Sequence, residues 1–240
     1  MYICTKITRI DSLRMPQKYY ADEPKYHVAV DCIIFGYDEG ELQVLFQHRT
    51  IEPYTGELTP LGGFVGTNET LEEAAYRVLA ERTGFNNLFL EQLEAFGEIN
   101  RDPGGRVISV AYYALLNKTD YNSNLLEKFN CKWLSVTKLP PLYFDHMKML
   151  RKAIARLQDK ITYTPIALKL IPDEFTMTQI QKLYEAILNE ELDKRNFRKR
   201  VCEMPYFVKT NKIDKTGSKR GAAIYTFDYD MYNELRNYHL

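Results

Sequence analysis

The stretch Leu61–Phe85 constrains the fold more than any other part of the chain, because it predicts a glycine loop, a capped helix and a helix-ending turn in succession. Thr70 and Glu73 have the spacing of a capping box, in which each side chain accepts a hydrogen bond from the backbone N–H of the other residue. Gly84 is well placed to end the helix. Apolar residues recur between these ends at helical spacing, which predicts one buried face. They are Leu71, Ala74, Ala75, Val78 and Leu79.

The same stretch resembles the Nudix signature. The helix of that family carries three glutamates at positions i, i+3 and i+4, which lie on one face and hold hydrated divalent ions against a pyrophosphate. Here Val78 stands at the first of these positions and Arg82 at the last, so that only Glu81 remains. The residues that do match the signature are Gly63, Glu69, Arg77 and Glu81.

The two replacements remove the chemistry that the signature serves. Mg²⁺ needs hard oxygen ligands in near-octahedral geometry, and proteins usually supply them as carboxylates together with substrate phosphates. Valine has no ligand atom, and the guanidinium of Arg82 is a permanent cation that repels a metal ion. We therefore expect a degenerate Nudix box that holds no metal and contains no catalytic residue, in a protein that is not an enzyme. The alternative, in which the glutamates of this helix only face solvent, fits the complete motif spacing less well.

The composition is that of an ordinary globular protein, with 45% apolar and 27% charged residues in 240 and a formal net charge of zero. The four cysteines form neither a CxxC motif nor a Cys/His spacing typical of metal sites. The N-terminus lacks the apolar core of a signal peptide, and no apolar run reaches the about 18 residues needed to span a bilayer. We expect a cytoplasmic protein without a cofactor and without a membrane partner.

We expect residues 25–160 to form a Nudix-like α/β (α+β) domain with a mixed sheet between helices. Residues 1–24 are expected to form an N-terminal extension. Apolar residues alternate in the expected strands as they do in half-buried sheets. A helix is expected over Asp145–Gln158, where apolar residues repeat at helical spacing. The expected strands are His27–Phe35, Leu42–Arg49, Leu93–Asn100, Val107–Leu116 and Cys131–Ser135.

A carboxylate interrupts the apolar pattern of the first strand. Asp31 is costly to bury without partners, so we expect it in a pocket or on an open face of the sheet. Arg49 ends the second strand, which in Nudix proteins lines the ligand cleft. The candidate effector-binding residues are Asp31, Arg49, Glu98, Asn100 and Tyr113. For each of them an ordinary sheet or surface position is an equally good interpretation.

A second domain is expected over residues 175–240, after a linker at residues 161–174 that contains Pro165 and Pro172. Thr176 and Gln179 form a second predicted capping box at the start of a helix. A polar turn, a helix over Lys194–Met204 and two strands follow, and this is the order of a winged helix-turn-helix. The two strands are expected over Tyr206–Ile213 and Ala222–Asp228.

Positive charge gathers in this second domain. Residues 194–221 contain ten Lys or Arg and two acidic residues, a net charge of +8, so the rest of the neutral chain carries −8. A basic helix face suits the major groove of DNA, where arginine pairs with guanine and lysine meets phosphates. A basic face that is merely solvated is the alternative. The candidate DNA-binding residues are Lys194, Arg195, Asn196, Arg198, Lys199, Arg200, Lys215, Lys219 and Arg220.

Together the two halves resemble the Nudix-related transcriptional regulators of the NrtR and AraR type. The segments FTMTQIQKLYEAIL and LDKRNFRKRV are similar to the DNA-binding core of these regulators. The resemblance implies a cytoplasmic homodimer that binds a palindromic double-stranded DNA operator, mostly as a repressor, and senses a small molecule with a degenerate Nudix domain. We expect the arabinose-responsive AraR branch, which controls sugar-utilisation genes, with L-arabinose as effector. The alternatives are an ADP-ribose-responsive regulator of NAD metabolism and an active ADP-ribose pyrophosphatase.

Overall fold

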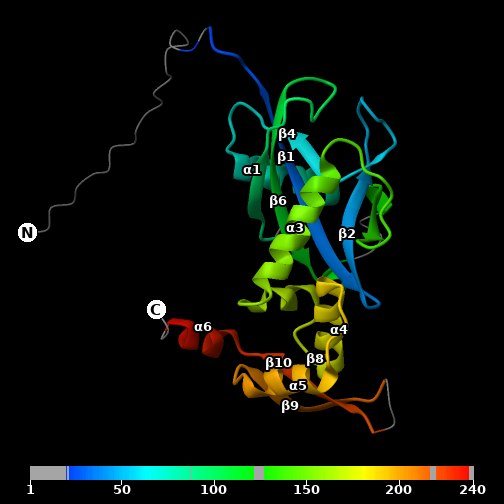
Figure 1. Cartoon of the computed structure of the whole chain (residues 1–240), viewed down its shortest axis with the longest axis vertical. Coiled ribbons are helices and arrows are strands. Elements are labelled where there is room, and N and C mark those ends of the chain that lie inside the picture. Colours follow the sequence, from blue (N-terminus) through cyan, green and yellow to red (C-terminus); the bar gives the residue numbers. More distant parts are fainter. Residues whose placement is uncertain (1–19, 21, 87, 122–126, 217–219, 238–240) are drawn as a thin grey trace, which may run out of the picture.

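The computed structural model describes residue 20 and residues 22–86, 88–121, 127–216 and 220–237. They form an upper body built on a seven-stranded sheet and a lower body built on a three-stranded sheet (Figure 1). Residues 1–19 and 21 of the N-terminal extension lie outside the described residues, and so does Lys219. Within the described part of the chain, no helix is both long enough and apolar enough to cross a membrane. The expected order of a mixed α/β body followed by a winged helix is confirmed.

The sheet of the upper body is mixed and has β1 (His27–Asp38) at its centre. β1 pairs in parallel with β6 (Val107–Leu116), from His27 opposite Val107 to Gly36 opposite Leu116. It pairs antiparallel with β2 (Glu41–His48) and with β4 (Leu61–Phe64), the short strand of the glycine loop. The other strands are β3 (Leu58–Thr59), β5 (Glu91–Phe96) and β7 (Cys131–Ser135).

Helices cover both faces of this sheet (Figure 1). α1 (Leu71–Thr83) packs on the face that carries Cys32, and α3 (His146–Lys160) packs on the face that carries Ile33. The two apolar clusters take alternate residues of β1, because successive side chains of a strand point to opposite faces. The predicted apolar stripe of α1 is largely buried, although its first member is 36% exposed. The buried members are Ala74, Ala75, Val78 and Leu79.

The lower body is a winged helix-turn-helix. Thr176 and Gln179 make the predicted capping box of its first helix. Asp193 caps the second helix by accepting a hydrogen bond from the backbone N–H of Asn196 (2.7 Å). The wing hairpin pairs with a short strand that precedes the first helix. In chain order the elements are β8 (Phe175–Thr176), α4 (Met177–Leu188), α5 (Lys194–Glu203), β9 (Phe207–Asp214) and β10 (Ala222–Phe227).

One apolar cluster runs through both bodies. It contains Leu157 of α3 and Leu183 of α4, both with 0% exposure. The 3-10 helix η2 (Pro165–Leu170), within the expected linker, adds three buried side chains to it. Gln158 Nε2 also donates a hydrogen bond to the backbone oxygen of Ile187 (2.9 Å). The two bodies of one chain are therefore packed against each other.

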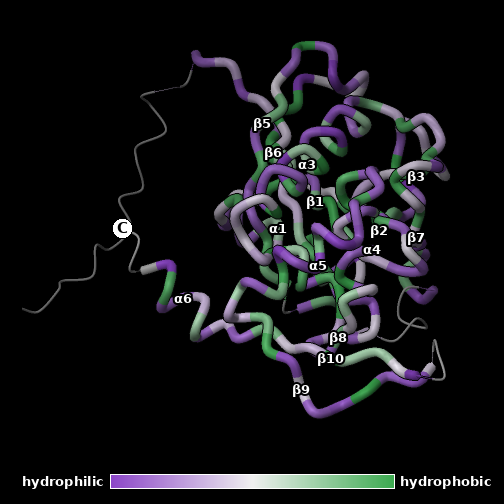
Figure 2. The backbone as a smooth tube through the Cα atoms, turned by 60° about the horizontal axis from the view of Figure 1, so that its bottom comes forward, coloured by the Kyte–Doolittle hydropathy of each residue, from purple (hydrophilic) through white to green (hydrophobic). Residues whose placement is uncertain are grey.

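Two of the differences between the sequence pattern and the structure change the length or number of the larger elements. β5 ends at Phe96, four residues before the expected strand end, because the chain leaves the sheet and turns at Ile99 and Asn100. A helix that the pattern does not predict, α6 (Tyr229–Asn237), follows the wing. Asp228 Oδ1 accepts a hydrogen bond from the backbone N–H of Met231 (2.9 Å) at its start. Both views show α6 projecting away from the rest of the molecule (Figures 1 and 2).

The shared cluster predicts that a cavity-forming substitution in the lower body also destabilises the upper body. Leu183→Ala removes a fully buried side chain, and we expect the free energy of unfolding to fall by about 2–5 kcal/mol. Denaturant unfolding followed by the fluorescence of Trp133, the single tryptophan, reports from β7 of the upper body. Leu235→Ala, at a 39% exposed position of α6, should change stability by less than about 0.5 kcal/mol. An unshifted Trp133 transition in Leu183→Ala would contradict the shared core.

Candidate functional site

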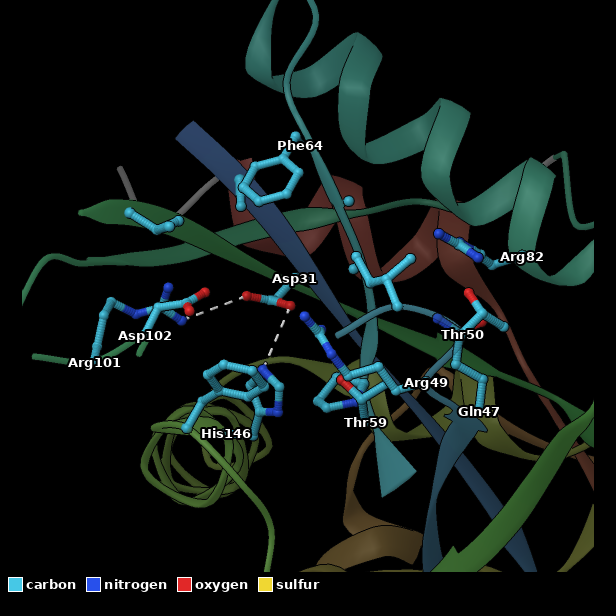
Figure 3. Close-up of a pocket in the computed structure, with 17 residues that line it drawn as sticks. Asp31, Gln47, Arg49, Thr50, Thr59, Phe64, Arg82, Arg101, Asp102 and His146 are labelled. Atoms are coloured by element: carbon cyan, nitrogen blue, oxygen red, sulfur yellow. Dashed lines mark ion pairs between the residues drawn. The ribbon is translucent and has the colours of Figure 1, made fainter. Parts of the chain in front are cut away.

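A cleft with a cavity of about 140 Å³ opens beside the glycine loop of the upper body. It lies between β1, the loop around β4, the end of α1 and the start of α3 (Figure 3). Two aromatic side chains, Phe64 and Phe144, stand among a mainly polar lining. The charged or titratable side chains of the lining are Asp31, Arg49, Arg82, Arg101, Asp102 and His146.

The glycine loop is fixed to α1 by a side-chain pair of the Nudix signature. Arg77 donates hydrogen bonds to both carboxylate oxygens of Glu69 (2.6 and 2.8 Å) and to the backbone oxygen of Phe64 (3.0 Å). The backbone N–H of Gly66 donates a further bond to Glu69 (2.6 Å). Arg77, and then the Gly66 N–H, lower the pKa of Glu69 to about 2. The carboxylate of Glu69 is therefore occupied in holding the loop.

Val78 belongs to the packed face of α1. Its side chain is 1% exposed and lies in the apolar cluster between α1 and the sheet. A Cβ atom on Gly63 would stand 2.7 Å from Cγ2 of Val78, so the glycine allows this close approach of loop and helix. Among the described residues, no group of three or more His, Cys, Asp or Glu side chains could hold a metal ion. With Glu69 occupied and Val78 buried, the residues present do not fit the divalent ion of the Nudix family.

Two arginines face the cleft without an acidic partner. Arg82 reaches into it from the last turn of α1 (Figure 3). Arg49 donates a hydrogen bond to the backbone oxygen of Pro53 (2.6 Å), and its guanidinium lies 4.8 Å from the centre of the Phe144 ring. Neither arginine forms an ion pair with a carboxylate in the described part of the chain. The cleft thus presents positive charge that a phosphate-bearing ligand could neutralise.

Buried polar groups form the floor of the cleft. Arg101 donates to both carboxylate oxygens of Asp145 (2.7 and 2.9 Å), and its Nη2 lies 3.9 Å from Oδ2 of Asp31. Ser109 donates a hydrogen bond to the same oxygen of Asp31 (2.5 Å). Nε2 of His146 lies 3.8 Å from the other oxygen (Figure 3). Asp145 stands at the N-cap of α3 but makes no capping hydrogen bond, since Arg101 engages its carboxylate.

The structure brings two of the five candidate effector residues into this cleft, namely Asp31 and Arg49. Glu98 forms a surface ion pair with a lysine of α3, and Asn100 lies in the exposed turn between β5 and β6. Tyr113 lines a separate cavity of about 180 Å³ beside η2. These three residues do not share a cleft with the other two.

Four charged or titratable cleft residues are missing from the sequence-based effector candidates, namely Arg82, Arg101, Asp102 and His146. Arg82 could have been predicted from the sequence, because a side chain at a metal-ligand position of the signature must face the ligand. Arg101 lies in a turn and His146 starts a helix. No local pattern places either of them opposite Asp31, so tertiary structure alone reveals them.

The second candidate surface is formed by α5 and the wing. Arg195 and Lys199 are exposed on α5, whereas Val201 is buried on its inner face. Arg198 donates a hydrogen bond to Thr178 Oγ1 of α4 (3.2 Å), and so lies partly between the two helices. β9 of the wing is mainly hydrophilic (Figure 2). The other described candidates, all exposed, are Lys194, Asn196, Arg200, Lys215 and Arg220.

Two family profiles match the chain in succession. The profile described as NUDIX domain matches residues 25–157, and the profile described as NrtR DNA-binding winged helix domain matches residues 167–227. A protein of Acinetobacter baylyi described as ADPR responsive transcriptional repressor NtrR is 35% identical over 224 residues, which are 90% of this chain and 89% of that protein. The chain belongs to the NrtR family of Nudix-related transcriptional regulators.

Solved structures of NrtR agree with this assignment. NrtR of Shewanella oneidensis in complex with a 27mer DNA is 27% identical, with a TM-score of 0.75, over 86% of this chain and 95% of that one. The Nudix domain of the same protein in complex with ADP ribose is 28% identical, with a TM-score of 0.50, over 60% of this chain and 99% of that one.

The NrtR assignment corrects one expectation from the sequence. A Nudix-related DNA-binding transcriptional regulator is confirmed, but the arabinose-responsive branch and L-arabinose as effector receive no support. The relatives with a stated effector name ADP-ribose, which was the alternative. The sequence pattern does not separate the two, because it leaves open how many arginines face the cleft.

His146 gives this NrtR-family cleft a pH dependence that can be measured. Burial lowers its pKa below the ordinary value of 6.5, against the opposing effect of Asp31. Above pH 6.5 the ring is neutral in both folded and unfolded chains. As the pH falls below that value, the unfolded chain takes up a proton that the folded one does not, so the free energy of unfolding falls, by at most about 1.4 kcal/mol per pH unit.

We expect His146→Gln to reduce this loss of stability. Denaturant unfolding at about pH 7.5 and about pH 5.5 measures it, with His48→Gln on β2 as the matched control. An equal pH slope in wild type and His146→Gln would show that His146 protonates freely in the folded protein.

Proposed function

We propose that this protein is a transcriptional repressor that binds a palindromic operator as a homodimer, and that ADP-ribose alters this binding by occupying the cleft without being hydrolysed. The observation that carries the proposal is Arg82, a cation that faces the cleft from a position where the Nudix signature has a metal-binding glutamate. The ADP-ribose named for the relatives supports the same ligand class.

The cleft matches a dinucleotide-like ligand better than a neutral sugar. Arg49 and Arg82 offer unpaired positive charge to a pyrophosphate, and the planar guanidinium suits two phosphate oxygens at once. Phe64, 51% exposed at the rim, and Phe144 offer aromatic surface to a base. A small neutral sugar has no charge with which to use the two arginines.

Binding without hydrolysis follows from the same replacements. Cleavage of a phosphoanhydride by metal-dependent enzymes uses the ion to neutralise developing charge and to activate water. Arg82 can neutralise phosphate charge, but a guanidinium cannot accept the proton of an attacking water. Glu69 is bonded to Arg77 and Gly66, which leaves it unsuited to serve as a general base.

The DNA-binding surface follows from the placement of α5. Its exposed face carries Arg195 and Lys199, so that the helix can enter a major groove with arginine on base edges and lysine on phosphates. A hydrogen bond from Arg198 to Thr178 links α5 to α4. Lys215 and Arg220, at the wing tip, are placed to reach the neighbouring backbone.

The response to the ligand is expected to change the spacing of the two winged helices in a dimer. The two bodies share one apolar cluster, so a hinge between them would expose buried side chains. A dimer reads two half-sites whose separation is fixed by the DNA helix. A small rotation of each subunit at the dimer contact would change the distance between the two α5 helices and release the operator.

The α5 assignment is tested with duplexes selected from a random pool by the wild-type protein. We expect Arg195→Ala to weaken binding of the selected duplex by about 1–3 kcal/mol and to relax its sequence preference. Lys199→Ala should weaken binding to all duplexes alike and reduce the slope of log affinity against log salt by about one. Gel-shift titration at several salt concentrations measures both. Lys152→Ala, exposed on α3, serves as control, and unchanged binding in both α5 variants would refute the assignment.

The role of Arg82 is tested by calorimetric titration with ADP-ribose. Arg82→Ala removes one charge-assisted contact to the pyrophosphate, and we expect the dissociation constant to rise about tenfold or more. Arg156→Ala, on α3 and 39% exposed, should leave it unchanged. Release of AMP on incubation of the wild type with Mg²⁺ and ADP-ribose would contradict binding without hydrolysis.

A further inference from the structure

Asp31 and His146 face each other across the floor of the cleft, too far apart for a direct hydrogen bond. Oδ1 of Asp31 and Nε2 of His146 are 3.8 Å apart, which is longer than a hydrogen bond. Ser109 engages only the other carboxylate oxygen, and within the described part of the chain no residue donates a hydrogen bond to Oδ1. Both residues are at most 6% exposed. Oδ1 lines the cleft and is not among the enclosed unpaired atoms of the described residues, so a group in the cleft can supply the missing hydrogen bond.

The chemistry of the two atoms selects a hydroxyl. Nδ1 of His146 is enclosed and has no hydrogen-bond partner among the described residues, so the proton of the neutral ring belongs on Nε2, beside Asp31. A hydroxyl can donate to Oδ1 and accept from Nε2–H at the same time. A phosphate oxygen would be repelled by the carboxylate, and an ammonium group would meet Arg49 and Arg101 in the same cleft.

The backbone of the glycine loop keeps this oxygen open to the cleft. Asp31 lies opposite Gly62 in the pairing of β1 with β4. A Cβ atom at Gly62 would stand 2.5 Å from Oδ1. Any larger residue at this position would therefore cover the oxygen that faces His146.

We propose that Asp31 and His146 form a hydroxyl subsite that binds the terminal ribose of a dinucleotide-like ligand such as ADP-ribose. The assignment rests on the function proposed above, with the pyrophosphate on Arg49 and Arg82. The cavity of about 140 Å³ is smaller than the about 300 Å³ or more of a site that encloses a drug-sized ligand. It suits one sugar ring, and leaves the adenosine at the open rim beside Phe64.

The experiment compares two ligands that share the adenosine and the pyrophosphate. ADP-ribose carries the terminal ribose and ADP lacks it. Calorimetric titration of the wild type should give at least about tenfold tighter binding of ADP-ribose, from one bond to a charged group and one to a neutral group. In Asp31→Asn and in His146→Ala this ratio should fall about tenfold. The affinity for ADP should stay unchanged in His146→Ala and should not fall in Asp31→Asn, where the carboxylate no longer repels the terminal phosphate. The matched controls are Asp38→Asn, on the exposed end of β1, and His48→Ala on β2, both of which should keep the ratio.

The outcomes distinguish failure of the subsite from failure of the proposed function. A wild type that binds ADP and ADP-ribose equally well overturns the subsite but leaves the proposed effector class standing. A ratio that persists in both folded variants, checked by circular dichroism, also overturns it. If one variant fails to fold, the other still gives the answer, because each weakens or removes one partner of the same hydroxyl. Binding of neither ligand to the wild type would overturn the proposed function and the subsite together.

Discussion

The buried negative charge of Asp31 on the central strand is the constraint on which the upper body depends. A carboxylate at this depth is tolerated only with partners, and they come from three other parts of the chain. Ser109 of β6 donates a hydrogen bond, Arg101 of the turn after β5 forms an ion pair, and His146 of the first turn of α3 lies 3.8 Å away without a direct hydrogen bond. Arg101 in turn holds Asp145 at the start of α3. Through these contacts the Asp31 carboxylate links the sheet to a connecting turn, and Arg101 of that turn links it to the start of α3.

A second pair explains how the Nudix loop persists where its metal site does not. The bond between Arg77 and Glu69 holds the glycine loop against α1 without any ion. Val78 adds apolar contact beneath the same loop, where a glutamate side chain would have to be kept out of the core. Arg82 then faces the cleft with the opposite charge to the family's residue. In the function proposed here, the cleft keeps its loop geometry while its preference changes from metal-bound substrate to free anion.

Local interactions are predicted well from this sequence, and long-range ones are not. Both capping boxes, at Thr70 and Thr176, are observed because each depends on residues three positions apart. The partners of Asp31 lie 70 or more positions away, and no periodic pattern relates them. Tyr113 is one of the sequence-based candidates for the cleft but lies outside it. It lies on the same face of β6 as Ser109, but four residues further along, and so about 13 Å away at 3.3 Å per residue.

The length of α3 connects the cleft to the DNA-binding unit. The helix spans about 18 Å from His146 at the cleft floor to Gln158, which bonds the backbone at Ile187 of α4. A ligand changes a conformational equilibrium only through contacts that differ between the two states. A ligand at the floor touches the first residue of α3, and the shared core around Leu157 and Leu183 transmits any tilt of this helix to α4. The lower body must then move as a unit with α3, so the sensitive quantity is the placement of the whole winged helix relative to the DNA, and not the internal geometry of α5.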